Sequence, residues 1–143
     1  TFLEKAIIEL VFFDDQKVDF EIKTQSFEKV LKESDFISVH VPAQKNYIFS
    51  KKEFSLMKDG AAIVNAARGG VVDEEALYEA IKNGTLGGAA LDVFEKEPAI
   101  GNKLAELDNV ILTPHIGAQT KEAQSLAANV IGEKIIQILR GVI

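Results

Sequence analysis

The sequence predicts an α/β protein built on a doubly wound parallel sheet, and three observations support this fold class. Short apolar runs alternate along the chain with amphipathic segments. The runs are continuously apolar, which is typical of strands that are covered on both faces. Helix-capping residues stand between one run and the next. Strand followed by helix, repeated, is the pattern of a parallel sheet.

Five apolar runs have the length expected of strands. They occupy residues 7–13, 36–41, 61–66, 88–94 and 110–112. The three prolines, Pro42, Pro98 and Pro114, all fall just after predicted strands, where a missing N–H does not interrupt a ladder.

Capping residues predict the first three helices. Ser26 precedes a helical pattern over residues 27–34. Ser50 and Glu53 have the spacing of a capping box. Asp73 is an N-cap before an acidic first turn, and Gly84 is the matching C-terminal stop.

Two further helices are predicted towards the end of the chain. Residues 102–107 are a short helix candidate, and a longer helix is expected to begin near Thr120 and to end before Gly141. Apolar residues at helical spacing give the longer helix a stripe that we interpret as a packing surface. The stripe consists of Ala123, Ala127, Val130, Ile131, Ile135, Ile138 and Leu139.

Composition excludes several classes of function. The 143 residues are one domain's worth of chain, with a net charge of -6 and no dense cluster of Lys and Arg, which argues against a nucleic-acid partner. No apolar run approaches the length of a bilayer span, so no membrane association is expected. Two distant histidines and no cysteine make a metal site unexpected. The absence of cysteine fits a reducing cytoplasm.

The unusual polar residues follow the predicted strands, one group after each. In open α/β sheets, ligands bind outside the carboxyl ends of the strands. The sequence therefore predicts a ligand site at that edge. In chain order the groups are Asp14 and Asp15; His40 and Pro42; Arg68, Gly69 and Gly70; Asp92 and Glu97; and His115 and Gly117.

Each of these residues also has a plainer interpretation. Asp14 suits ribose hydroxyls in a dinucleotide site, but also a helix cap or a turn. The stretch "ARGG" suits either a turn with a solvated Arg68 or a bidentate grip on a carboxylate. Asp92 suits a ligand site at the end of its strand, but also the cap of a turn. His40 is interpreted as a packed or backbone-contacting residue near the ligand.

Glu97 and His115 are the most suggestive pair, because a carboxylate that binds an imidazole fixes its tautomer for proton transfer. Sequence alone does not show that the two side chains touch.

Three blocks resemble the signature segments of the D-isomer-specific 2-hydroxyacid dehydrogenases. They are "NAARGGVVDEEAL", "GGAALDVFEKEP" and "TPHIGAQT", in the family's order, and "SDFISVHVP" is similar to a further segment. The resemblance covers residues 11–141 and is strongest to D-3-phosphoglycerate dehydrogenases, followed by hydroxypyruvate and glyoxylate reductases. Gln119 departs from the family, since many members carry Ser there.

The resemblance implies a Rossmann-like sheet, NAD as cofactor and hydride transfer to or from a D-2-hydroxy acid. It implies that Arg68 holds the substrate carboxylate, that His115 is the general acid/base and that Glu97 tunes His115. It implies a cofactor site formed by Asp14 at the adenosine ribose, Asp92 near the nicotinamide, and other residues along the strand ends. These others are His40, Val41, Pro42, Ala66, Arg68, His115 and Gly117.

The start of the chain departs from the family, which places a strand and a G-x-G-x-x-G turn before the acidic residue. Here "TFLEKAIIEL" precedes Val11 and contains no glycine. We therefore expect residues 1–143 to be a partial dinucleotide-binding domain that lacks the first strand, its glycine-rich turn and the substrate domain. The favoured explanation is that the sequence is part of a longer enzyme. A truncated product, a rearranged N-terminus and a partner that fills the gap are the alternatives.

The same resemblance implies a cytoplasmic homodimer that acts on 3-phosphoglycerate in serine biosynthesis. The rival hypothesis is a non-catalytic dinucleotide-binding or interaction module.

Overall fold

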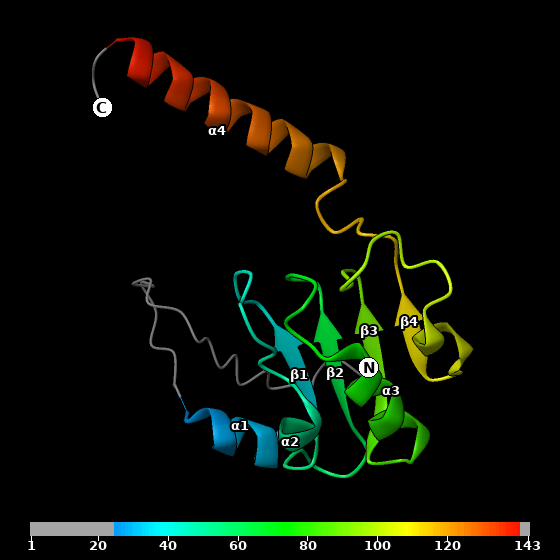
Figure 1. Cartoon of the computed structure of the whole chain (residues 1–143). Helices are drawn as coiled ribbons and strands as arrows, with labels where there is room; N and C mark the ends of the chain where they lie inside the picture. Colours follow the sequence, from blue (N-terminus) through cyan, green and yellow to red (C-terminus); the bar gives the residue numbers. More distant parts are fainter. Residues whose placement is uncertain (1–24, 141–143) are drawn as a thin grey trace, which may run out of the picture.

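Four parallel strands form one sheet in the order β1-β2-β3-β4 in the computed structural model (Figure 1). The structure describes residues 25–140, so the predicted strand at 7–13 and Asp14 lie outside the described residues. The parallel α/β sheet is confirmed for this part of the chain. Its strands are β1 Phe36–Val39, β2 Ala61–Asn65, β3 Leu86–Leu91 and β4 Val110–Leu112.

The helices begin at the predicted caps. Their bounds are α1 Phe27–Glu33, α2 Lys51–Phe54, α3 Glu74–Lys82, the 3₁₀ helix η1 Lys103–Glu106 and α4 Lys121–Leu139. The side chains of Ser26, Asp73 and Thr120 each accept a hydrogen bond from the backbone N–H three residues later. Ser50 and Glu53 are bonded through the Ser50 N–H and hydroxyl, at 3.1 and 2.6 Å from Glu53 Oε2.

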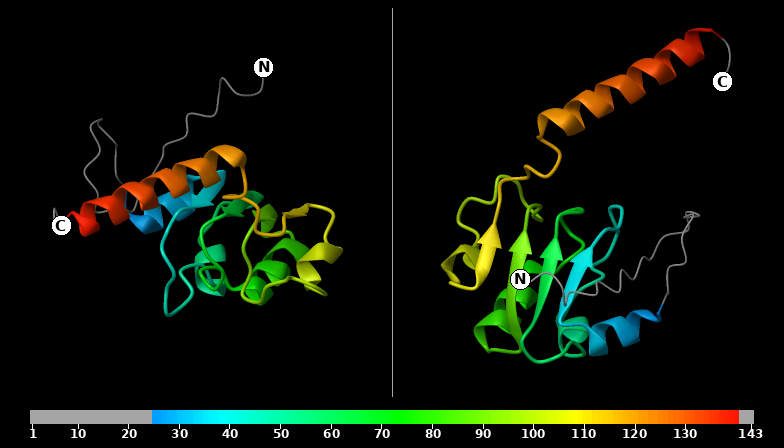
Figure 2. Two further views of the ribbon diagram at one scale, coloured as in Figure 1. Left: turned by 90° about the horizontal axis from the view of Figure 1, so that it is seen from above. Right: turned by 180° about the vertical axis from the view of Figure 1, so that it is seen from behind.

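The core lies between the sheet and the helices α2 and α3, which cover the same face (Figures 1 and 2). Apolar side chains of the strands meet Phe54 of α2 and Leu77 of α3 there, and Leu31 brings α1 into the same cluster. The strand residues buried in this cluster are Ile37, Val39, Ala61, Ile63, Leu86, Ala89 and Leu91.

The expectation that the strands are covered on both faces is wrong for β1 and β4. Burial alternates along β1, where Phe36 is 78% exposed, and Ile111 of β4 is 67% exposed. Successive strand residues point to opposite faces, and α2 and α3 cover only one of them. The second face of these strands therefore carries exposed apolar side chains.

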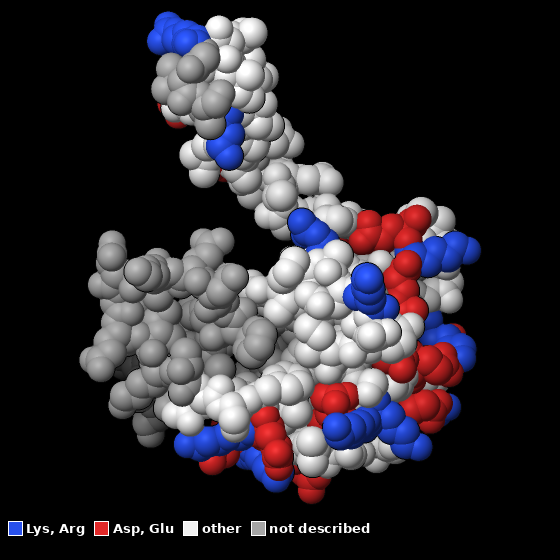
Figure 3. Space-filling model, turned by 60° about the vertical axis from the view of Figure 1, so that its left-hand side comes forward, with Lys and Arg blue, Asp and Glu red and all other residues white. Residues whose placement is uncertain are grey.

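Helix α4 begins and ends as predicted, but its apolar stripe is not buried against the described residues of this chain. The helix extends away from the sheet (Figures 1 and 2), and none of its residues is buried. Its visible surface is largely uncharged, whereas charged side chains gather on the body of the protein (Figure 3). The exposed large apolar residues of α4 are Leu126, Val130, Ile131, Ile135, Ile136, Ile138 and Leu139. Within residues 25–140, no helix is both long and apolar enough to cross a membrane.

Candidate active site

The strand ends bring the predicted site residues to one edge of the sheet. Ala66 and Arg68 follow β2, Asp92 directly follows β3, and His115 lies three residues beyond β4. Since all four strands are parallel, their carboxyl ends share this edge. It is the position where open α/β sheets bind ligands.

Asn65, the last residue of β2, holds the backbone of the Arg68 turn through two hydrogen bonds. Asn65 is 2% exposed, its Nδ2 donates to the carbonyl of Arg68 at 3.0 Å, and its Oδ1 accepts from the N–H of Ala67 at 3.1 Å. The guanidinium of Arg68 is exposed and donates to the Ala67 carbonyl at 2.6 Å. The buried amide of Asn65 thus fixes the backbone of the turn, and the guanidinium of Arg68 is exposed to solvent.

The two glycines after Arg68 have different structural roles. Gly70 has a φ of +76°, which a turn requires. A Cβ on Gly69 would lie 1.9 Å from the carbonyl oxygen of Phe94, so this glycine allows a close backbone contact. The neighbour at Gly69 is the chain itself, in the loop that leads to Glu97.

Glu97 and His115, predicted as a pair, do touch. Glu97 Oε2 lies 2.8 Å from His115 Nδ1, and Glu97 Oε1 accepts from the N–H of Phe94 at 3.2 Å. The hydrogen bond to His115, followed by that from Phe94, holds the pKa of Glu97 below its usual range. In the neutral imidazole this contact requires the proton on Nδ1, which leaves Nε2 for proton exchange with a substrate.

The backbone of His115 is held in the left-handed region, with a φ of +54°. Its N–H donates to the Thr113 carbonyl at 3.0 Å, and Gln119 Nε2 donates to its carbonyl at 3.1 Å. Such a conformation is uncommon outside glycine and is often found at functional sites. Gln119, the departure from the family pattern, therefore supports the conformation of His115.

Asp92 organises the turn that carries His115. Its carboxylate accepts from the Thr113 hydroxyl at 2.5 Å and from the N–H groups of Ile116 and Gly117, both at 2.8 Å. Burial raises the pKa of Asp92, but these hydrogen bonds outweigh burial and the net pKa is lowered. Of the two interpretations of Asp92, the cap of a turn is the one described by these contacts, and its cofactor role stays a prediction.

His40 corrects one expectation, because among residues 25–140 it is neither packed nor bonded to backbone. It is exposed, and its Nε2 lies 2.8 Å from the Ser38 hydroxyl. Burial alternates along β1, and His40 continues this alternation after the buried Val39, so its ring lies on the exposed side together with Ser38. Val41 packs against the core, and Pro42 is exposed.

Two residues that organise the site were not singled out from the sequence. Asn65 stands inside the block "NAARGG", where a buried amide at the end of an apolar strand is the available signal. Thr113 reaches Asp92 from the next strand, a contact that required knowing that β3 and β4 are neighbours.

A hollow lined mostly by apolar side chains lies against the Glu97–His115 pair. Apolar walls lower the local dielectric and strengthen polar contacts within. Its lining residues are Phe94, Glu97, Pro98, Ala99, Ile100, Leu112, Thr113, Pro114 and His115. In the part of the chain that the structure describes, no three His, Asp or Glu side chains gather as a metal-binding group.

The fold and this edge define a dinucleotide-binding α/β domain, and comparison with known proteins identifies its family. Residues 7–117 match the model of the D-isomer specific 2-hydroxyacid dehydrogenase, NAD binding domain. The chain belongs to this family.

Individual relatives agree with that assignment. The chain is 52% identical over 123 residues to a D-3-phosphoglycerate dehydrogenase of Archaeoglobus fulgidus, covering 84% of this chain and 23% of that protein. It is 45% identical over 139 residues to a hydroxypyruvate reductase of Thermotoga maritima, covering 92% of this chain and 45% of the relative.

A solved structure shows the same fold. It is the D-lactate dehydrogenase of Aquifex aeolicus in complex with NAD and lactic acid, with 36% identity and a TM-score of 0.74 over 83% of this chain and 41% of that one. The chain thus spans less than half the length of each of these three proteins.

Proposed function

We propose that this chain is the NAD-binding part of a dehydrogenase that transfers a hydride between the nicotinamide of NAD and C2 of a D-2-hydroxy acid. The observation that carries the proposal is the 2.8 Å contact between Glu97 Oε2 and His115 Nδ1 at the carboxyl edge of a dehydrogenase-family sheet. A histidine oriented by a carboxylate is the usual general acid/base for moving a hydroxyl proton.

The edge of the sheet fits the nicotinamide end of NAD. After β2, Ala66 and Arg68 are exposed and Ala67 between them is buried. The flat nicotinamide ring would therefore meet the small side chain of Ala66 and accessible backbone. Gly117 is held against Asp92 with no side chain between them. When bound, NAD supplies the hydride chemistry, and the protein orients the reactants.

We assign the remaining cofactor contacts by the family resemblance. Asp14 takes the ribose hydroxyls of the adenosine, which favours NAD over NADP. His40, Val41 and Pro42 line the adenosine side, and Ala66, Asp92 and Gly117 lie towards the nicotinamide.

The substrate is held by Arg68, whose guanidinium is suited to a bidentate grip on its carboxylate. His115 accepts the proton of the 2-hydroxyl at Nε2 during oxidation and returns it during reduction, while Glu97 stabilises the protonated ring. This proton transfer contributes about 10²–10⁴ to the rate.

We propose 3-phosphoglycerate as the substrate, which places the reaction in serine biosynthesis. The 52% identity to a D-3-phosphoglycerate dehydrogenase supports this choice. Reduction of hydroxypyruvate or glyoxylate is the second candidate, favoured by the relative of Thermotoga maritima that matches 92% of the chain.

We also propose a cytoplasmic homodimer. The cysteine-free sequence suits a reducing compartment. The exposed apolar face of α4 supports an assembly larger than this chain alone.

The test is oxidation of NADH by the full-length protein with 3-phosphohydroxypyruvate, hydroxypyruvate and glyoxylate in parallel. We expect the highest kcat/KM with 3-phosphohydroxypyruvate, and loss of turnover in Arg68→Ala and His115→Ala. The matched control is Arg140→Ala, which removes the only other arginine, at the end of α4, and is expected to leave turnover unchanged. A folded protein that binds NADH and reduces none of these acids contradicts the proposal and favours a non-catalytic module.

A further inference from the structure

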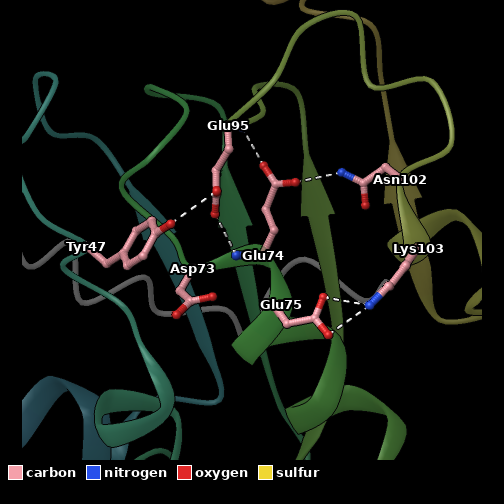
Figure 4. Close-up of a pocket in the computed structure, with 7 residues that line it drawn as sticks. All are labelled: Tyr47, Asp73, Glu74, Glu75, Glu95, Asn102 and Lys103. Atoms are coloured by element: carbon pink, nitrogen blue, oxygen red, sulfur yellow. Dashed lines mark hydrogen bonds and ion pairs between the residues drawn. The ribbon is translucent and has the colours of Figure 1, made fainter.

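Two glutamates join the Arg68 segment to the Glu97 segment. Glu74 is the first residue of α3, and Glu95 lies in the loop after β3. The N–H of Glu74 donates to Glu95 Oε1 at 3.0 Å, and the N–H of Glu95 donates to Glu74 Oε1 at 2.5 Å. We call this reciprocal pair of bonds the Glu74–Glu95 clasp (Figure 4).

The clasp brings two carboxylates together without a cation between them. The clasp lies in a second hollow, which is lined by Tyr47, Asp73, Glu74, Glu75, Glu95, Asn102 and Lys103. Lys103 bonds to Glu75 and not to the clasp, at 2.9 and 3.0 Å. Like charges repel, so the arrangement depends on the backbone N–H groups that each carboxylate accepts. Charge repulsion alone would separate Glu74 and Glu95, so the two backbone hydrogen bonds hold them together.

Two further side chains hold the outer oxygens of the clasp. Tyr47 donates its hydroxyl to Glu95 Oε2 at 3.1 Å, and Asn102 donates to Glu74 Oε2 at 2.6 Å. The hydrogen bond to Glu95 raises the pKa of Tyr47, which keeps its hydroxyl protonated as a donor. Figure 4 shows these side chains converging from separate segments of the chain on the start of α3.

Glu95 of the clasp stands two positions before Glu97, the carboxylate of the proposed proton-transfer pair. Phe94, the residue before Glu95, donates its N–H to Glu97. The carbonyl of Phe94 packs on Gly69, which directly follows Arg68. The loop from Phe94 to Glu97 is therefore fixed to the Arg68 turn by the Gly69 contact and to the start of α3 by the clasp. Both attachments hold the segment that carries Glu97.

We propose that Glu74 and Glu95 are positioning residues for the reaction: their clasp holds the Glu97 loop against the Arg68–α3 segment and so sets the orientation of the His115 ring relative to Arg68. The inference rests on the proposed function for its catalytic meaning. Neither glutamate touches the reacting atoms in this arrangement. Their effect passes through Glu97 and the ring that Glu97 orients.

The test compares three variants of the full chain by the ¹⁵N imidazole spectrum, recorded at a pH at which the spectrum itself shows neutral rings. The spectrum reports which ring nitrogen carries the proton, and the two histidines of the sequence give few signals to assign. Glu95→Asp keeps the charge but is too short to accept from the Glu74 N–H, so it removes one of the two bonds of the clasp. Glu95→Gln loses the charge but keeps an oxygen that accepts from Glu74. Glu75→Gln is the matched control, since it removes a charge in the same hollow without touching the clasp.

We expect the Nδ1–H form of His115 in the unaltered protein, in Glu95→Gln and in Glu75→Gln, and a mixture of tautomers in Glu95→Asp. In the full-length protein, kcat of Glu95→Asp should fall about 10–10²-fold, as expected for a misplaced catalytic group, with a smaller change in KM. Tyr47→Phe, which removes one outer bond and no charge, should shift the tautomers less in the same direction.

The opposite ranking overturns the proposal. If Glu95→Asp behaves as the unaltered protein while Glu95→Gln loses the Nδ1–H form, Glu95 acts through its charge and not through the clasp. If both variants keep the tautomer and kcat, the clasp does not position His115. Turnover and tautomer are separate readouts: an unaltered protein without turnover, whose tautomer still responds to Glu95→Asp, would refute the proposed function and leave the clasp standing.

Discussion

The two segments that carry Arg68 and His115 reach the same edge of the sheet but are supported in different ways. The Arg68 turn rests on a buried amide, Asn65, and on a backbone contact at Gly69. The His115 turn rests on two carboxylates, Asp92 and Glu97, in an exposed part of the molecule.

This difference predicts different sensitivities. Packing defects act on tightly filled interiors, where small changes of volume cannot be absorbed. Carboxylate contacts depend on ionisation and therefore on pH. We expect the Arg68 turn to respond to added volume and the His115 turn to respond to acid.

The largest effect is expected for Gly69→Ala, which adds volume at the Arg68 turn. The new Cβ would lie 1.9 Å from the Phe94 carbonyl oxygen, so the backbone must move. Overpacking of this kind costs roughly 1–3 kcal/mol, and we expect at least that loss in the free energy of unfolding measured with urea. The control is Gly132→Ala in α4, where a Cβ meets nothing within 4 Å. That substitution should stabilise the helix by about 0.5–1 kcal/mol if it has any effect.

Equal losses from Gly69→Ala and Gly132→Ala would contradict the view that the Arg68 turn is closely packed. A loss at Gly69 alone, together with reduced turnover, would show that folding and substrate binding share this backbone contact.

A smaller effect is expected when acid acts on the His115 turn. The pKa values of Asp92 and Glu97 are both lowered, so the fold favours their charged forms. Their contribution is complete above the ordinary carboxyl values of about 4 and is lost as the pH falls through the lowered values. We expect the amide signals of Ile116 and Gly117 to shift below about pH 4. The amide of Ala67, held by the uncharged Asn65, should stay in place until the protein unfolds.

Simultaneous movement of all three amides would mean that acid unfolds the edge as one unit, and the proposed contrast would fail. Asp92→Asn sharpens the test, because this variant removes the titrating charge and should abolish the early shift at Ile116 and Gly117.

The sequence predicted the parts of this structure that depend on local signals. Ser26, Asp73 and Thr120 cap helices as expected, because an N-cap needs only a short polar side chain beside its own helix. The Glu97–His115 contact was predicted as a pair, since both residues follow strands of one parallel sheet. Asp14 and the run at residues 7–13 lie outside the described residues and stay predictions.

Other contacts between distant segments were not predicted. The clasp joins residues 21 positions apart, and Thr113 bonds to Asp92 across the same separation. Each contact depends on which strands are neighbours and how far each loop extends, and no local pattern encodes either. The exposure of α4 within this chain was not predicted for a related reason: an apolar stripe predicts burial but does not identify what it packs against.

Helix α4 is a third region to compare with the Arg68 and His115 turns. It follows the His115 turn in the chain, yet none of its residues is buried in the core. In the monomer, we expect Ile135→Ser to change the free energy of unfolding of the sheet by no more than about 0.5 kcal/mol, as for a surface position. Ile63→Ser, in the core, is the contrasting variant, since Ile63 is 1% exposed and Ile135 is 51% exposed. Urea unfolding should be followed by a signal from the sheet, at several protein concentrations. A large loss from Ile135→Ser that shrinks as the protein is diluted would show that α4 is buried against a second molecule, because association stabilises by mass action and this stabilisation vanishes at low concentration. A large loss that is independent of concentration would show that α4 packs within its own chain, and the extended position of the helix would then be wrong.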